Sequence, residues 1–126
     1  MGPRILLVED HPDTLRIVTK LLEGYGYAVE TAGDGAGALG RLALVEYNGV
    51  ILDLLLPEVN GLEVIRHVRS WEYPVPIVIL TAHQHLALKA IREGAQAYLI
   101  KPFSSQALRD LATRWFDHSA RHLASQ

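Results

Sequence analysis

Short apolar segments alternate with longer amphipathic segments along the chain. The short segments consist mostly of β-branched and aliphatic residues, which is typical of strands. They occupy residues 5–8, 28–32, 50–52, 77–80 and 97–100. After each of them, apolar residues recur three and four positions apart. The pattern therefore predicts five strands and five helices in alternation.

Each predicted helix has a stripe, that is, a set of mostly apolar residues three and four positions apart that lie on one face. Some helices also have residues that typically begin or end a helix. Pro12 suits a first helical turn, and Gly24 or Gly26 can end that helix in a left-handed conformation. The stripes are formed by Leu15, Val18, Leu21 and Leu22; by Leu39, Leu42, Ala43 and Glu46; by Leu62, Ile65, Val68 and Arg69; by Leu88, Ile91 and Arg92; and by Leu108, Leu111, Ala112 and Trp115.

The uninterrupted apolar character of residues 77–80 indicates a strand that is buried on both faces, as in a parallel sheet. Parallel strands joined by helices need right-handed crossover connections, and these place helices on both faces of the sheet. The sequence therefore predicts a doubly wound α/β fold of the flavodoxin-like kind, with a five-stranded parallel sheet and five helices.

Composition narrows the function without naming it. The 126 residues suit one domain, and 49% hydrophobic and 21% charged residues are ordinary for a globular protein. The absence of cysteine excludes disulfides, thiolate nucleophiles and cysteine-ligated metals, and it fits the cytoplasm. With a net charge of −2 the chain has no excess of basic residues, which a nucleic-acid-binding domain typically has. We find no signal peptide and no apolar run long enough to span a membrane.

Chemically active side chains follow four of the predicted strands. Glu9 and Asp10 come after the first strand, Asp53 after the third, Thr81 after the fourth and Lys101 after the fifth. In doubly wound sheets the working site lies just beyond the carboxyl ends of the strands. We therefore expect these residues to gather at one edge.

Such a group of residues favours phosphoryl transfer. Carboxylates that converge within about 4–6 Å repel one another, and a divalent cation such as Mg²⁺ or Mn²⁺ relieves that repulsion. Asp53 could then act as a carboxylate nucleophile, with Lys101 and Thr81 meeting the phosphoryl oxygens. Each residue alone has an ordinary explanation as a loop, cap or strand residue. Their joint occurrence at the ends of four strands favours one site.

At these residues the chain resembles the receiver domain of two-component response regulators, over essentially its whole length. The motifs that carry the resemblance are Glu9-Asp10 after the first strand, Asp53 with Pro57 and Gly61 downstream, Thr81-Ala82, Gly94-Ala95, and Tyr98 followed by Lys101-Pro102-Phe103. The resemblance covers residues 1–126 as one domain. Residues 117–126 either extend the last helix or begin a linker.

The resemblance implies a role for each matching residue. Asp53 is expected to accept the phosphoryl group, Asp10 to bind Mg²⁺ directly, and Glu9 to act on the ion through water. The backbone carbonyl of Leu55 is expected to complete the protein's share of the metal ligands, and Lys101 to pair with the phosphoryl group.

Two further expectations concern the switch and the sheet. The resemblance implies that Thr81 and Tyr98 form the switch, that is, the pair of side chains that changes position on phosphorylation. It also implies that the Lys101–Pro102 bond is cis. We expect the strand order 2-1-3-4-5, with helices one and five on one face and the other three on the opposite face. This order places strands one and three side by side, so that Asp10 and Asp53 can share one cation.

The resemblance also implies partners. The phosphodonor would be a sensor histidine kinase or a histidine phosphotransfer protein, and the switched surface would be the fourth helix, fifth strand and fifth helix. The domain would not be an enzyme, although it would assist its own phosphotransfer and dephosphorylation. The output domain or effector is not specified. The resemblance also allows a homodimer. In one subfamily an acidic residue in this stretch forms salt bridges across the dimer, and Ala95-Gln96-Ala97 lacks that acid.

Two other interpretations compete. Gly35, Gly37 and Gly40 form a GxGxxG pattern after a strand, and Asp53 follows Gly35 by 18 residues, as in a dinucleotide-binding enzyme. That interpretation leaves Glu9 and Lys101 unexplained and needs a central strand before the glycines. A receiver-like module that binds partners without being phosphorylated is the other alternative.

Overall fold

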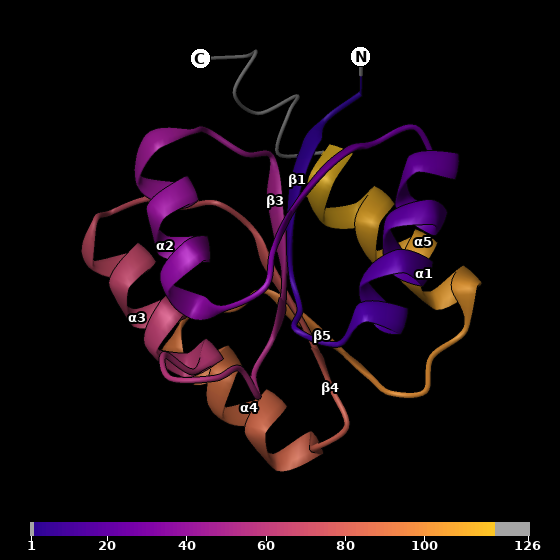
Figure 1. Cartoon of the computed structure of the whole chain (residues 1–126). Coiled ribbons are helices and arrows are strands. Elements are labelled where there is room, and N and C mark those ends of the chain that lie inside the picture. Colours follow the sequence, from indigo (N-terminus) through magenta and orange to yellow (C-terminus); the bar gives the residue numbers. More distant parts are fainter. Residues whose placement is uncertain (1, 118–126) are drawn as a thin grey trace.

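The structure, a computed structural model, describes residues 2–117, which form a parallel sheet with helices on both faces (Figure 1). The strands are β1 (Arg4–Val8), β2 (Ala28–Ala32), β3 (Gly49–Asp53), β4 (Ile77–Thr81) and β5 (Ala97–Ile100). Their order is β2-β1-β3-β4-β5, and every neighbouring pair is parallel. The predicted fold class and strand order are confirmed.

The strands at the centre of the sheet are the most buried. Every residue of β3 and β4 is buried, whereas β2 and β5 at the two edges are largely half-buried. The register aligns the carboxyl ends, since Val8 pairs with Leu52, Asp53 with Leu80, and Thr81 with Ile100. Residues that follow these strands therefore meet at one edge of the sheet.

Each strand is followed by a helix. The helices are α1 (Pro12–Gly24), α2 (Gly35–Leu44), α3 (Gly61–Ser70), α4 (Gln84–Glu93) and α5 (Ser105–Ala112), and a π-helical turn, η1 (Thr113–Asp117), follows α5. α3 begins with a reciprocal capping box between Asn60 and Glu63. The left-handed glycine after α1 is Gly26, with φ 101°.

Two apolar cores lie on the two faces of the sheet. α2, α3 and α4 cover one face, with Leu42, Val64 and Ala90 among the buried residues there. α1 and α5 cover the other face, where Val18 and Leu108 are buried (Figure 1). This is the predicted distribution of helices. None of the described helices is long and apolar enough to cross a membrane.

Two predicted stripes end differently in the structure. α2 ends at Leu44, so Glu46 lies in the exposed loop that follows. After α5 the π-helical turn adds a residue, which buries Phe116 fully and leaves Trp115 half-buried against the same core. The Phe116 ring packs on Gly49, where a Cβ atom would lie only 2.1 Å from it. Whether the chain continues as helix or linker concerns residues 118–126, which lie outside the described part.

Candidate phosphoacceptor site

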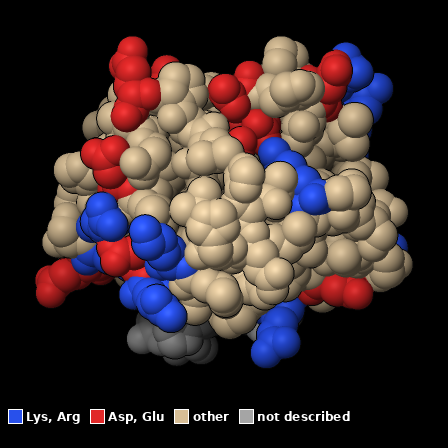
Figure 2. Space-filling model, turned by 90° about the horizontal axis from the view of Figure 1, so that it is seen from below, with Lys and Arg blue, Asp and Glu red and all other residues tan. Residues whose placement is uncertain are grey.

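The predicted site residues lie at the carboxyl-terminal edge of the sheet. Glu9 and Asp10 follow β1, Asp53 ends β3, Thr81 ends β4 and Lys101 follows β5. Figure 2 looks at this end of the molecule and shows acidic side chains beside a basic one near the middle of the face. The order of the strands in the sheet makes β1 and β3 neighbours, and this brings the acids of both strands together.

Three carboxylates form the centre of the site. Glu9, Asp10 and Asp53 each offer an oxygen atom, and these atoms all lie within 4.8 Å of one another. Glu9 is only 2% exposed and Asp53 only 8%, whereas Asp10 is exposed. The cluster is therefore a shallow acidic pocket with one ligand open to solvent.

Lys101 provides the positive charge of the site. Its Nζ atom lies 2.9 Å from Oε1 of Glu9 and 3.7 Å from Oδ2 of Asp53. Its backbone N–H donates to the carbonyl of Thr81 at 2.8 Å, and the Lys101–Pro102 bond is cis, as expected. Among the described residues, Lys101 is the only base that forms an ion pair with these carboxylates.

Burial and charge shift the pKa values of the two buried acids in opposite directions. Burial, reinforced by the negative charge of Glu9, raises the pKa of Asp53 to about 6, although a backbone hydrogen bond from Leu55 and the charge of Lys101 oppose the rise. Burial alone would raise the pKa of Glu9 as well. Hydrogen bonds from Lys101 and His11, together with the charge of Lys101, hold that pKa below its ordinary value.

Backbone contacts fix the Asp53 carboxylate. The N–H of Leu55 donates to Oδ1 of Asp53 at 3.1 Å, while the Leu55 side chain is 53% exposed beside it. Gly61 at the start of α3 closes this loop, because its N–H donates to the carbonyl of Leu54 at 3.0 Å. A Cβ atom on Gly61 would lie 2.8 Å from the backbone oxygen of Asp53, so this close approach requires glycine.

Thr81 and Tyr98 lie near the cluster without belonging to it. Thr81 is fully buried, and its hydroxyl accepts a hydrogen bond from the backbone N–H of His83 at 3.1 Å. Tyr98, on β5, is half-buried against the core under α2, α3 and α4. The structure therefore brings Glu9, Asp10, Asp53 and Lys101 into one cluster, with Thr81 and Tyr98 on the strands beside it.

The donor set suits a hard divalent cation. All the side-chain ligands are carboxylate oxygens, which Mg²⁺ and Mn²⁺ prefer. One ammonium group balances only part of their charge, and the pKa of Asp53 is raised by burial in the first place and by the negative charge of Glu9 in addition. A divalent cation would lower the repulsion between these carboxylates, so the residues present fit the ion.

Sequence patterns could not reveal two features of the site. The hydrogen bond of 3.1 Å from the backbone N–H of His11 to Oε2 of Glu9 depends on how the chain turns after β1. The side-chain pairing of Lys101 with Glu9 depends on a rotamer choice. The expectation that residues just after parallel strands meet at one edge of the sheet, called here the strand-end rule, nevertheless identified both partners of that pair.

The glycine-rich alternative does not fit the fold. β2, which precedes the glycines, is an edge strand, whereas a dinucleotide fingerprint follows a central one. Gly35 instead allows α2 to approach the loop between β3 and α3, because a Cβ atom there would lie 2.2 Å from the carbonyl oxygen of Val59. Asp34 accepts a hydrogen bond from Gly37 at 2.7 Å and caps α2.

Comparisons with known sequences give one consistent result. The sequence model of the response regulator receiver domain matches residues 5–113. The transcriptional regulatory protein QseB of Haemophilus influenzae is 42% identical over 117 residues, which are 88% of this chain and 50% of that protein. The chain spans about half the length of several curated relatives that it matches.

Solved structures agree in fold. The receiver domain of a putative Luxo repressor protein from Vibrio parahaemolyticus has a TM-score of 0.92 at 25% identity, covering 100% of this chain and 98% of that one. The receiver domain of a sensor histidine kinase from Pseudomonas aeruginosa has a TM-score of 0.86 at 31% identity, covering 93% and 99%. The latter structure holds a magnesium ion coordinated in its active site cleft.

Proposed function

Because this chain belongs to the receiver domain family of two-component response regulators, we propose that it accepts a phosphoryl group on Asp53 in a reaction that depends on Mg²⁺ or Mn²⁺. One observation carries the proposal. The buried carboxylate of Asp53 lies 3.7 Å from the ammonium group of Lys101, and its oxygen lies within 4.8 Å of carboxylate oxygens of Glu9 and Asp10, close enough for one cation to be shared.

The chain's own residues prepare the transfer. With a pKa of about 6, Asp53 is mostly ionised at neutral pH and can attack phosphorus. One of its oxygens forms the new P–O bond as the bond from phosphorus to the donor breaks, and a histidine donor leaves as imidazole. The N–H of Leu55 holds Oδ1, and Lys101 lies beside Oδ2, where it can pair with a transferred oxygen.

The ion would be held by the carboxylates of Asp10 and Asp53 and by the backbone carbonyl of Leu55, with Glu9 acting through water. When bound, it neutralises charge on the carboxylates and on the phosphoryl oxygens. The receiver domain from Pseudomonas aeruginosa, with its magnesium ion in the active site cleft, supports this assignment.

Thr81 and Tyr98 would convert phosphorylation into a change of surface. The Thr81 hydroxyl would leave the backbone N–H of His83 and donate to a phosphoryl oxygen, and the Tyr98 ring would move into the space that Thr81 vacates. The altered surface would be α4, β5 and α5. We also propose that the domain assists its own dephosphorylation rather than acting on a separate substrate.

The partners follow from the family. The phosphodonor would be a sensor histidine kinase or a histidine phosphotransfer protein, and the transfer would take place in the cytoplasm. A kinase donor is supported by GacS, a sensor histidine kinase of Pseudomonas protegens, which itself contains a segment 32% identical to this chain. An output domain or effector would receive the signal, and a homodimer would present two such surfaces. Nucleic acid would be bound by that output domain and not by this one, and no membrane contact is required.

Incubation with acetyl phosphate and Mg²⁺, followed by intact mass spectrometry, tests the proposal. We expect a gain of one phosphoryl group in the parent protein and none in Asp53→Ala or in the presence of EDTA. A parent protein that stays unmodified with acetyl phosphate and with phosphorylated histidine donors would favour the alternative of a module that is not phosphorylated.

A further inference from the structure

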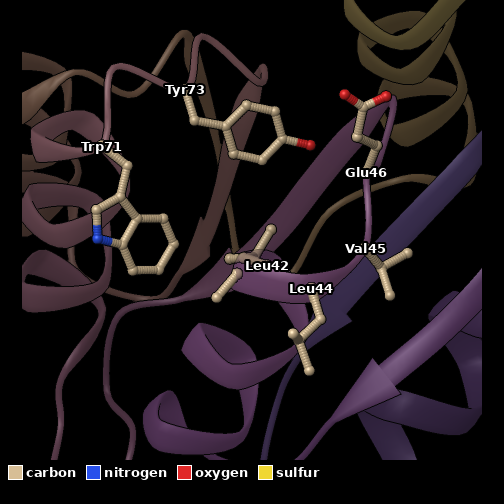
Figure 3. A pocket seen from close by; sticks show the side chains of 7 residues that line it. Leu42, Leu44, Val45, Glu46, Trp71 and Tyr73 are labelled. Carbon is tan, nitrogen blue, oxygen red and sulfur yellow. The ribbon is translucent and has the colours of Figure 1, made fainter.

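An open groove of about 480 Å³ lies at the edge of the sheet opposite the carboxylates. One wall comes from the end of α2 and the loop before β3, and the other from the loop after α3 (Figure 3). The labelled residues that line it are Leu42, Leu44, Val45, Glu46, Trp71 and Tyr73. Asp53 ends β3, whereas the groove adjoins the loop that precedes this strand, so the two sites lie at opposite ends of it.

The walls of the groove are held in place by hydrogen bonds. The Tyr73 hydroxyl accepts from the backbone N–H of Tyr47 at 2.8 Å and donates to its carbonyl at 3.2 Å. The backbone N–H of Trp71 donates to the carbonyl of His67 at 3.2 Å, which ends α3 in a fixed turn. A ligand would therefore meet a groove that is already formed.

Large apolar side chains are exposed on both walls. Leu44 is 88% exposed and Trp71 is 42% exposed. Figure 3 shows the six-membered ring of Trp71 directed toward Leu42, with Leu44 beside it on the same wall. Isolated exposed apolar residues are ordinary, but apolar residues that share one concave surface mark a binding site.

The charge of the rim is negative. Glu46 lines the groove. Glu72 is exposed and stands between Trp71 and Tyr73 in the sequence, but it is not one of the lining residues. Neither forms an ion pair with a basic residue in the described part of the chain. The guanidinium group of Arg69 donates to the carbonyls of Tyr73 and Gly94 and forms no ion pair with either acid in the described residues. Burial raises the pKa of Tyr73, and the charge of Glu46 adds to that rise.

We propose that this groove binds a basic, amphipathic peptide segment of a partner protein. An aliphatic or aromatic side chain of the segment would lie between Trp71 and Leu44, and a neighbouring lysine or arginine would pair with Glu46. Such a contact is independent of phosphorylation at Asp53 and would be available in both states of the domain.

A second copy of this chain fits the groove poorly. In a symmetric dimer the same patch occurs on both subunits, so a contact centred on the groove would bring Glu46 of each copy toward Glu46 of the other. These like charges would oppose association, whereas a basic segment neutralises them. Charge thus selects the peptide over the dimer.

Nuclear magnetic resonance titration with three synthetic hexapeptides tests the proposal. The peptides, each acetylated and amidated, are the basic apolar RKLFKR, the acidic apolar EDLFDE and the basic polar RKGSKR. We expect RKLFKR to shift the backbone amides of residues 42–46 and 71–73 and to saturate. The other two should bind the groove at least about tenfold more weakly, because each lacks one of the two contacts. RKGSKR also reports any purely electrostatic binding at Glu9, Asp10 and Asp53.

Matched variants locate the contacts. Leu44→Ala should weaken binding of RKLFKR about tenfold, whereas Leu88→Ala, which removes an exposed leucine from α4, should leave it unchanged. Glu46→Gln should weaken it about twofold to fivefold at low salt and have little effect at high salt.

Three results would overturn the proposal. Binding of EDLFDE as tight as that of RKLFKR would show that the groove does not select a basic peptide. Chemical shift changes by RKLFKR that are confined to other surfaces would show that the peptide does not bind in the groove. Sedimentation that reveals a dimer abolished by Leu44→Ala would assign the groove to a second copy.

Discussion

Lys101 pairs with Glu9 across the edge of the sheet, at 2.9 Å between Nζ and Oε1. Glu9 is only 2% exposed, so this contact compensates a carboxylate that has almost no access to water. Lys101 is closer to Glu9 than to Asp53, where its distance to Oδ2 is 3.7 Å. The lysine therefore offsets part of the negative charge of the three carboxylates, and under the proposed function it would pair with the phosphoryl group after transfer.

A double-mutant cycle with Glu9→Gln and Lys101→Met should give a coupling energy of about 1–3 kcal/mol, the range for hydrogen bonds to charged groups. Lys101→Met alone should destabilise the protein most, since it leaves Glu9 buried and unpaired. Urea unfolding in EDTA measures all four proteins. Additive effects would show that the contact does not stabilise the fold.

Asp53→Asn should stabilise the metal-free protein at neutral pH. A carboxyl group whose pKa rises from 3.8 to about 6 on folding holds its proton more tightly in the folded state. The stability that it contributes is therefore full below pH 3.8, falls as the pH rises toward 6 and is lost above that value. We expect the variant to gain about 1–3 kcal/mol at pH 7 and almost nothing near pH 3.5.

Thermal unfolding in EDTA across this pH range checks the expectation. Asp13→Asn is the matched control, because Asp13 is an exposed acid near the same edge. An Asp53→Asn protein that is no more stable than its parent at pH 7 would contradict the burial argument.

Mg²⁺ should bind weakly in the absence of phosphate, and Asp10→Asn should weaken it by about tenfold or more, because affinity follows the charge of the ligands. Isothermal titration calorimetry is the direct measurement. Asp13→Asn again serves as control, since its carboxylate is not part of the cluster and pairs with Arg16. Unchanged affinity in Asp10→Asn would remove Asp10 from the metal site.

Thr81→Ala should still accept a phosphoryl group but should respond poorly at Tyr98. In the proposed mechanism the Thr81 hydroxyl moves to donate a hydrogen bond to the phosphoryl group, and this movement vacates the space that the Tyr98 ring enters. Without the hydroxyl, phosphorylation would not cause the Tyr98 ring to move. Nuclear magnetic resonance spectra with and without beryllofluoride compare this variant with Thr31→Ala, on the edge strand β2. If Tyr98 shifts equally in all proteins, the coupling runs by another route.

The strand-end rule explains how much could be predicted from sequence. Apolar runs define parallel strands closely, so predicted strand limits differ from the observed ones by one residue at most. Arg4, Gly49, Asp53 and Thr81 fall outside the predicted runs because they are charged, lack a side chain or are polar. The same rule places Glu9, Asp10, Asp53, Thr81 and Lys101 at one edge. In the structure the three carboxylates and Lys101 converge there, and Thr81 ends the neighbouring strand without joining the cluster.

Features that depend on three-dimensional packing escaped that rule. The π-helical turn after α5 buries Phe116 fully and leaves Trp115 half-buried against the same core, and helical periodicity alone cannot reveal an extra residue in a turn. The groove beside Trp71 combines side chains from two loops that are distant in sequence. Leu44 lies outside the apolar stripe predicted for this helix, and its position at the end of α2 leaves it exposed.

The central claim is that Asp53 is the phosphoacceptor. The most direct measurement is chemical mapping of the modified residue after incubation with acetyl phosphate and Mg²⁺. Borohydride reduces an aspartyl phosphate to homoserine with release of phosphate, and peptide mass spectrometry then locates the homoserine. We predict homoserine at position 53 alone in the parent protein and at no position in Asp53→Ala. Homoserine at another aspartate, or phosphate retained by Asp53→Ala, would contradict the assignment.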